Sequence, residues 1–171
     1  MALNIKSFTD GFLRSAPLIL LIYICISEFH TQLYFWNIFS FNFQFIIIYY
    51  WVLRDPSILG YGFVFSCGVI NDVVLSLPLG TSSLSYLFVS LVAAYVRNAT
   101  VRSTLFTDWL TFIIAILIGN FITFFLLKNF AEVRAEYIPM FYNSLFTFIL
   151  YPVFWGIFEL YKRAIALRTY D

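Results

Sequence analysis

The sequence has few charged residues. Asp, Glu, Lys and Arg make up only 11% of its 171 residues, against about 25% in an average soluble domain. Hydrophobic residues make up 62% of the chain and aromatic residues 22%. A water-soluble fold of this length has too little interior to bury that much apolar surface. The composition therefore excludes an ordinary soluble domain and predicts that most of the chain lies in lipid.

Groups for nucleic-acid binding and catalysis are also scarce. The net charge is only +1, so the chain has no basic field that would hold nucleic acid. Its two cysteines, Cys25 and Cys67, stand inside apolar runs, where free thiols usually act as small hydrophobic groups. His30 is the only histidine, and no residue pattern pairs a nucleophile with a base. No compact metal-ligand pair is present either, so neither catalysis, nor a metal, nor a cofactor is expected.

Six apolar segments are long enough, or nearly so, for helices that cross about 30 Å of hydrocarbon, which takes about 20 residues. They are residues 11–29, 38–53, 57–77, 81–96, 109–127 and 138–160. The first is interpreted as a retained membrane helix, because no small-residue cleavage site follows it. The sequence thus predicts an all-α polytopic membrane protein, in which residues 1–171 form a single integral membrane domain with a bundle of six transmembrane helices.

The second segment is ambiguous, because residues 39–45 alternate between apolar and polar types with the period of a strand. An isolated strand in lipid would leave a row of backbone groups unpaired. A helix instead places Asn37, Ser40 and Gln44 on one face. We therefore expect a helix in this segment.

Basic residues predict which ends of the helices face the cytoplasm. With six spans and an internal N-terminus, only Lys128 and Arg134 lie outside. The eight basic residues on the cytoplasmic side are Lys6, Arg14, Arg54, Arg97, Arg102, Lys162, Arg163 and Arg168. Both termini are therefore expected in the cytoplasm.

Asp72 is the most informative single residue, because an ionisable group inside a span is costly and tends to face protein or water. It shares a four-residue periodicity with Gly68, and Ser82 and Tyr86 form a similar row of small and hydroxyl residues in the next segment. The two rows are joined by Pro78, Leu79 and Gly80.

These residues predict a short antiparallel hairpin. Pro78 ends the first helix, Gly80 can take the positive φ of a tight reversal, and Thr81 or Ser82 can cap the next helix. Two roles for Asp72 are open: a docking point for a ligand or partner, or a hydrogen-bond acceptor that bridges to Ser82, Ser83 or Tyr86. In the second role, Asp72→Asn is expected to be mild.

Other polar residues in the apolar segments are expected to join helices rather than bind substrates. Asn120 and Asn143 can form hydrogen bonds between helices. Glu159 is expected to pair with Lys162 or Arg163.

Three short motifs follow one another in the first half of the chain. They are residues 50–59 (YWVLRDPSIL), 68–72 (GVIND) and 78–80 (PLG). Their order and spacing resemble the MreD family of bacterial rod-shape-determining membrane proteins: an aromatic helix end, a short cytoplasmic turn with Arg54 and Pro56, a glycine-containing helix ending in Asp72, and a Pro-Leu-Gly hairpin. Residues 150–152 (LYP) with Trp155 are similar to the end of that family. This chain departs from the family at Asn71 and in the serine-rich start of segment 81–96.

The resemblance implies a non-enzymatic scaffold in the bacterial cytoplasmic (inner) membrane. Its partners would be an MreC-like single-span protein and, indirectly, actin-like MreB filaments and the enzymes of peptidoglycan synthesis. The alternative is a six-span substrate-capture subunit of a vitamin transporter. In that family the first span carries an Ala-x-x-x-Ala contact, whereas segment 11–29 contains only Ala16. A membrane enzyme of lipid metabolism ranks third, because no cytoplasmic loop is rich in carboxylates or histidine.

Overall fold

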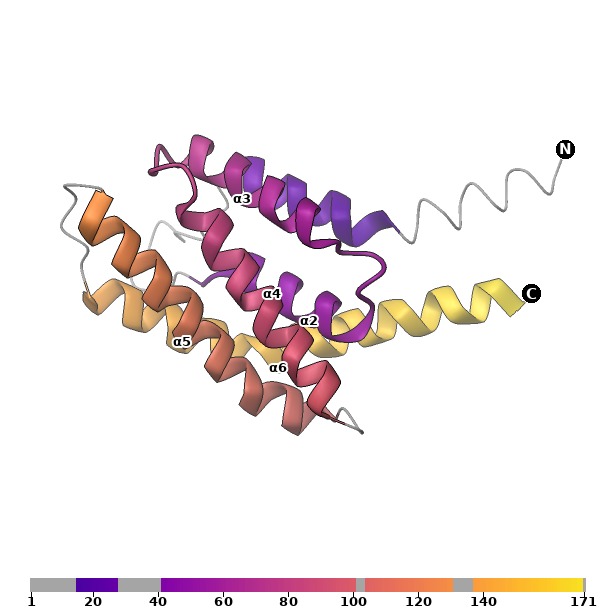
Figure 1. Cartoon of the computed structure of the whole chain (residues 1–171). Helices are drawn as coiled ribbons and strands as arrows, with labels where there is room; N and C mark the ends of the chain where they lie inside the picture. The colour runs from indigo at the N-terminus through magenta and orange to yellow at the C-terminus, as the bar shows by residue number, and fades with distance from the viewer. Residues whose placement is uncertain (1–14, 28–40, 101–103, 131–136, 171) are drawn as a thin grey trace, which may run out of the picture.

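The computed structural model describes residues 15–27, 41–100, 104–130 and 137–170. Every regular element in these ranges is an α-helix, and each of the six apolar segments contains one, so the all-α prediction is confirmed. An N-terminal helix covers Ser15–Ile26. It is followed by α2 (Phe43–Arg54), α3 (Tyr61–Val74), α4 (Thr81–Ala99), α5 (Leu105–Phe130) and α6 (Tyr137–Tyr170), as Figure 1 shows.

The ambiguous second segment is helical from Phe43 onward. Asn42 caps this helix, since its side chain accepts a hydrogen bond from the Phe45 N–H at 3.3 Å. The Asn42 N–H in turn donates to Thr147 Oγ1 on α6 at 2.8 Å. Asn37 and Ser40 lie outside the described residues, so their predicted common face with Gln44 stays a prediction.

The helix boundaries differ from those of the apolar segments. Helix α5 begins at Leu105 rather than at residue 109, and α6 continues to Tyr170 rather than ending at residue 160. Helix α3 is shorter than segment 57–77, because residues 56–58 form a turn and Leu75 is the C-cap. Hydropathy marks the apolar part of a helix and does not mark its ends, which depend on caps and turns.

Helix α4 holds the bundle together. It packs against α2, α3 and α5, and α5 packs against α6. Figure 1 shows the N-terminal helix and α3 on one side of the molecule, α5 and α6 on the other, and α4 and α2 between them. The start of the N-terminal helix and the end of α6 both point toward the same end of the bundle.

Helix α2 lies inside the protein. Every residue from Phe45 to Leu53 is buried, including Trp51, although tryptophan is also common at membrane interfaces. Trp51 instead lies against Tyr50, Phe158 and Tyr161. The helix has 12 residues and is therefore about 18 Å long. Residues 45–53 of this helix are covered by neighbouring helices and face neither water nor lipid.

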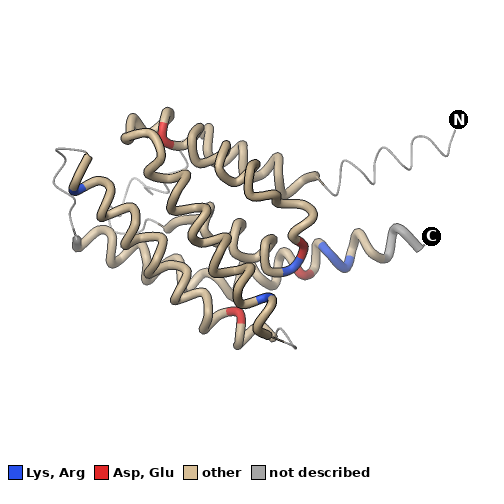
Figure 2. The backbone as a smooth tube through the Cα atoms, in the orientation of Figure 1, with Lys and Arg blue, Asp and Glu red and all other residues tan. Residues whose placement is uncertain are grey.

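The outer surface of the bundle is apolar. Large hydrophobic side chains are exposed on α3, α4, α5 and α6; on α5 they follow one stripe of Leu110, Ile114, Leu117, Phe121 and Phe125. Figure 2 shows that the charged residues of the described ranges lie near the two ends of the bundle. Two helical segments, Leu105–Phe130 and Ile138–Ala166, are long and apolar enough to cross a membrane.

Candidate functional site

The α3–α4 hairpin brings Asp72 to the start of α4. The Asp72 side chain is fully buried in the last turn of α3. Its Oδ2 accepts a hydrogen bond from the Gly80 N–H at 2.8 Å, and its Oδ1 accepts one from the Ser82 N–H at 2.7 Å. The Ser83 hydroxyl lies 3.5 Å from Oδ2. Asp72 therefore caps α4 from the preceding helix, at the end where the helix dipole favours negative charge.

The reversal passes through Gly80 as predicted, but Pro78 does not end the first helix: α3 already ends at Val74, with Leu75 as its C-cap. The cap of α4 also differs from the prediction. Gly80 is the N-cap of α4 with φ +101°, as a tight turn through glycine requires. Because glycine offers no side-chain acceptor, Asp72 supplies it. The predicted cap by Thr81 or Ser82 is wrong: the Thr81 hydroxyl donates to the Pro78 carbonyl at 2.8 Å, and Ser82 Oγ accepts from Asn71 Nδ2 at 2.9 Å. Leu79, at the tip, is exposed.

Gly68 allows α3 and α4 to approach closely. A Cβ atom at this position would lie 2.3 Å from the Cα of Ser83 and 2.6 Å from its backbone nitrogen. Only a residue without a side chain fits such a contact between backbones. The Gly68 and Asp72 row thus faces α4 as predicted, but Gly68 lies against Ser83 rather than against the row of Ser82 and Tyr86.

We expect Gly68→Ala to destabilise the protein by about 1–3 kcal/mol, because the backbones of α3 and α4 must separate to admit the methyl group. Thermal unfolding of the purified protein measures this. Gly62→Ala on the same helix is the matched control, since a Cβ there meets nothing within 4 Å. Equal unfolding temperatures for the two variants would contradict the close contact.

Tyr86 and both cysteines meet beside this hairpin. Tyr86 is buried, and its ring forms a T-shaped pair with the Phe45 ring at a centroid distance of 6.0 Å. Cys25 of the N-terminal helix makes side-chain contacts with Cys67 on α3 and with Tyr86. Nothing in the spacing of the two cysteines indicates this contact, because it depends on how the N-terminal helix packs. Among the described residues, no group of three His, Cys, Asp or Glu side chains could hold a metal ion.

A small cavity of about 160 Å³, lined by both polar and apolar side chains, adjoins the same end of the hairpin. Ser85 and Thr123 share a hydrogen bond of 2.7 Å at its wall. Its other polar lining residues are Asn42, Gln44, Asn71, Ser82, Tyr86 and Asn143. These are uncharged hydrogen-bonding groups, which suit a small neutral polar molecule.

A second polar site lies where α2, α5 and α6 meet, at the other end of the bundle. The Arg54 guanidinium forms an ion pair of 2.7 Å with Asp108 Oδ2, and the carboxylate is buried. Trp155 Nε1 donates to the same oxygen at 3.2 Å. The Arg54 guanidinium carbon also lies 5.5 Å from the Trp155 ring centroid, within the range of a cation–π contact.

Arg54 and Pro56 were predicted in a short cytoplasmic turn, but Arg54 is the last residue of α2, and its partner Asp108 was not predicted. Pro56 is exposed as expected, whereas Arg54 is mostly buried by the ion pair. In the sequence, the only indication of a role for Asp108 is that this carboxylate stands directly before the apolar segment 109–127. The expected pair of Glu159 is present, since Arg163 Nε lies 3.7 Å from it, and the Tyr50 hydroxyl donates to Glu159 at 3.2 Å.

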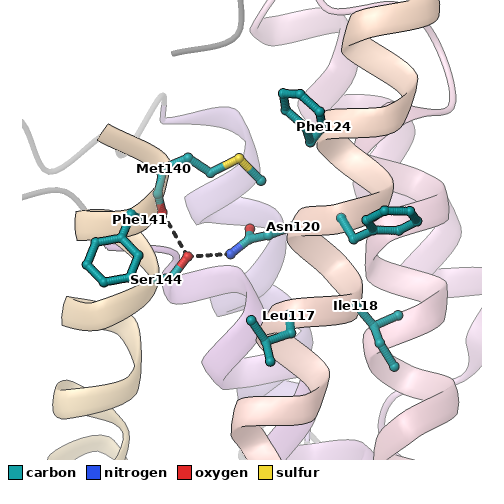
Figure 3. A pocket seen from close by; sticks show the side chains of 8 residues that line it. Leu117, Ile118, Asn120, Phe124, Met140, Phe141 and Ser144 are labelled. Carbon is teal, nitrogen blue, oxygen red and sulfur yellow. Dashed lines mark hydrogen bonds between the residues drawn. The ribbon is translucent and has the colours of Figure 1, made fainter. Parts of the chain in front are cut away.

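A groove of about 520 Å³ separates the second half of α5, before Lys128 in its last turn, from the first half of α6. The two helices are joined across it by a hydrogen bond from Asn120 Nδ2 to Ser144 Oγ at 2.6 Å, and the Ser144 hydroxyl donates to the Met140 carbonyl at 2.7 Å (Figure 3). The predicted interhelical role of Asn120 is confirmed. The remaining lining is apolar: Leu117, Ile118, Phe121, Phe124, Met140 and Phe141.

Searches with protein-family models, among curated proteins and among solved structures found no match to this chain. The function is therefore argued from the residues and from their geometry.

Proposed function

We propose that the chain is a multi-pass protein of the bacterial cytoplasmic membrane, with six transmembrane helices and both termini in the cytoplasm. The exposed apolar surface of the helices supports this, because a water-soluble monomer rarely exposes large contiguous apolar patches. Basic side chains gather where α2 ends and α5 begins: Arg54 pairs with Asp108, Arg97 donates to the Val52 carbonyl, and Arg163 lies beside Glu159, which accepts from Tyr50. Lys128 is in the last turn of α5, at its opposite end. This uneven distribution supports a cytoplasmic location for the first end.

Labelling of single cysteines in intact cells tests the topology. In a protein whose Cys25 and Cys67 are replaced by Ala, we expect Val133→Cys to react with a membrane-impermeant thiol reagent and Thr169→Cys to react only after permeabilisation. The permeabilised sample is the control for accessibility. Labelling of residue 169 but not of residue 133 in intact cells would contradict the proposed orientation.

We propose further that the protein is a non-enzymatic scaffold of the bacterial cell-elongation machinery, similar to MreD. It would connect an MreC-like single-span protein, and through it actin-like filaments, to peptidoglycan synthesis. The observation that carries this proposal is the ordered motif from residue 50 to residue 80. Its polar residues serve contacts between helices: Arg54 pairs with Asp108, and Asp72 caps α4. A rigid bundle built in this way suits an adaptor whose binding surfaces are helix faces.

Depletion of the protein tests this function. Rod-shaped cells should become round when the protein is depleted, and an affinity-tagged copy purified from membranes should bring a single-span protein with it. Expression of the protein from a plasmid should restore the rod shape. Unchanged cell shape together with stoichiometric co-purification of a vitamin would contradict the scaffold and favour the transporter subunit.

The transporter alternative would need a ligand site, and the cavity beside the α3–α4 hairpin is the candidate for it. Its volume of about 160 Å³ lies below the range of about 300–1,000 Å³ that is usual for small-molecule pockets. The cavity therefore favours a ligand smaller than a typical vitamin. Native mass spectrometry of the purified protein distinguishes the two functions, because a capture subunit would carry a bound molecule that Asn71→Leu releases.

A further inference from the structure

We propose that the groove between α5 and α6 binds one transmembrane helix of a partner protein, and that Asn120 receives a hydrogen bond from a donor side chain of that helix. The proposal rests on the proposed function in one respect, namely that the protein acts through a partner in the membrane. It adds the place of contact and the chemistry of the contacting segment.

Within the part of the chain that the structure describes, only one group of the Asn120 amide has a hydrogen-bond partner. Its Nδ2 donates to Ser144, whereas no donor from the described residues reaches its Oδ1. Figure 3 shows that this oxygen points into the space between Met140 and Phe124. The groove therefore presents a hydrogen-bond acceptor among apolar side chains.

The position of Asn120 along α5 makes this acceptor costly in lipid. Asn120 precedes Lys128 by two helical turns, which corresponds to about 12 Å along the axis. Hydrocarbon chains have no hydrogen-bond donors, so a carbonyl oxygen at that depth lacks a partner unless a protein supplies one. A lipid tail could fill the groove but could not satisfy Asn120.

Helix α5 cannot rotate to bring Asn120 inward. Gly119, the residue before Asn120, faces α2 and α4: a Cβ at this position would lie 2.8 Å from the Phe45 ring and 3.0 Å from Val89. Helix α5 is thus packed closely against α2 and α4 at this level, and Asn120 is held toward α6. The direction in which Asn120 Oδ1 points is therefore set by the packing of α5 against α2 and α4.

The dimensions of the groove suit one helix. Its lining on α5 extends from Leu117 to Phe124, which is about 10 Å or two helical turns. Leu117, Phe121 and Phe141 at its edges are each more than 60% exposed. The chemistry predicts a partner segment with Ser, Thr or another donor facing Asn120, and with small residues one turn away that permit close approach.

Photo-crosslinking in intact cells tests the site. A benzophenone amino acid is placed at residue 121 or 141 in the groove, and at residue 88 on the exposed face of α4 as the control. We expect adducts from positions 121 and 141, and none from 88, with the attachment point inside the transmembrane segment of a single-span protein. Adducts with a second copy of this chain, or no protein adduct at either groove position, would overturn the proposal.

Two substitutions in the full-length protein test the contact itself. Leu117→Trp, which fills the groove, should lower the yield of the adduct from position 141 by about tenfold, whereas Leu110→Trp on the same helix should leave it unchanged. Asn120→Leu should lower the yield by about threefold, the effect of one membrane hydrogen bond. Thermal unfolding of each variant separates loss of binding from loss of folding. An unchanged yield in a folded Leu117→Trp variant would overturn the proposal.

Failure of this inference differs from failure of the scaffold function. If depletion rounds the cells and a single-span protein co-purifies, but the groove positions give no adduct, the scaffold stands and the docking site lies elsewhere. If the groove captures a transmembrane helix but depletion leaves cell shape unchanged, the docking site stands and the scaffold function is wrong.

Discussion

Replacing Asp72 with Leu is expected to lower the free energy of unfolding by about 3 kcal/mol. The carboxylate accepts two backbone N–H groups of the first turn of α4. Each hydrogen bond to a charged group contributes about 1.5 kcal/mol or more, and a buried donor without a partner costs a similar amount. Because Gly80 has no side chain, the N-cap residue itself cannot take over this role.

Asp72→Asn is expected to be damaging as well, by about 2 kcal/mol, contrary to the expectation from the sequence. An amide has one acceptor oxygen, so its NH₂ group would face either the Gly80 N–H or the Ser82 N–H. The mild outcome assumed that the partners were hydroxyl groups, which can turn to donate or accept. They are backbone N–H groups, which can only donate.

Thermal unfolding of the purified Asp72 variants checks both expectations. Ser66→Ala is the control on the same helix, because the Ser66 hydroxyl donates only to the Gly62 carbonyl within α3 and the residue is exposed. A wild-type unfolding temperature for Asp72→Leu, together with loss of the co-purified partner, would reject the capping role and favour the docking role.

Replacing Asp108 with Leu is expected to destabilise the protein by about 3–5 kcal/mol, because the substitution leaves the Arg54 charge without its partner. The Arg54 side chain is only 20% exposed, so water replaces the carboxylate poorly. Trp155 Nε1 loses its acceptor at the same time. The double variant Arg54→Met/Asp108→Leu should recover most of the loss, since replacing both charges by apolar groups removes the unpaired ion.

A double-mutant cycle on thermal or denaturant unfolding measures the coupling between Arg54 and Asp108. Asp55→Asn is the matched control: this neighbouring carboxylate accepts from the Ser57 hydroxyl at the surface, and its substitution should change stability by less than about 0.5 kcal/mol. Additive effects of the two single substitutions at residues 54 and 108 would contradict the ion pair.

Part of the α3–α4 site could be predicted from local sequence. The reversal at residues 78–80 depends on the backbone preferences of proline and glycine, which act over a few residues. The rows around Gly68 and Ser82 depend on the helical period, which also is local. The capping of α4 by Asp72 could not be predicted, because it depends on the angle and distance at which the two helices pack.

The other contacts depend wholly on packing. Arg54 and Asp108 lie 54 positions apart in the chain, and Cys25 meets Cys67 only because the N-terminal helix lies beside α3 and α4. The same is true of the burial of Trp51, whose residue type is as common in a membrane interface as in a protein interior. No spacing rule connects residues on separate helices.

The sequence by itself determined that the chain is helical, where the six helices lie, and where the chain reverses between α3 and α4. Only the tertiary structure decided which face of each helix is inside, and therefore which polar groups meet. In an amphipathic helix of a soluble protein the polar face marks the outside, but here the exposed stripe of α5 is as apolar as its buried residues Phe112, Ala115 and Ile116. Where both faces are apolar, the pattern of hydrophobicity carries no information about orientation, and side-chain packing alone selects the contacts.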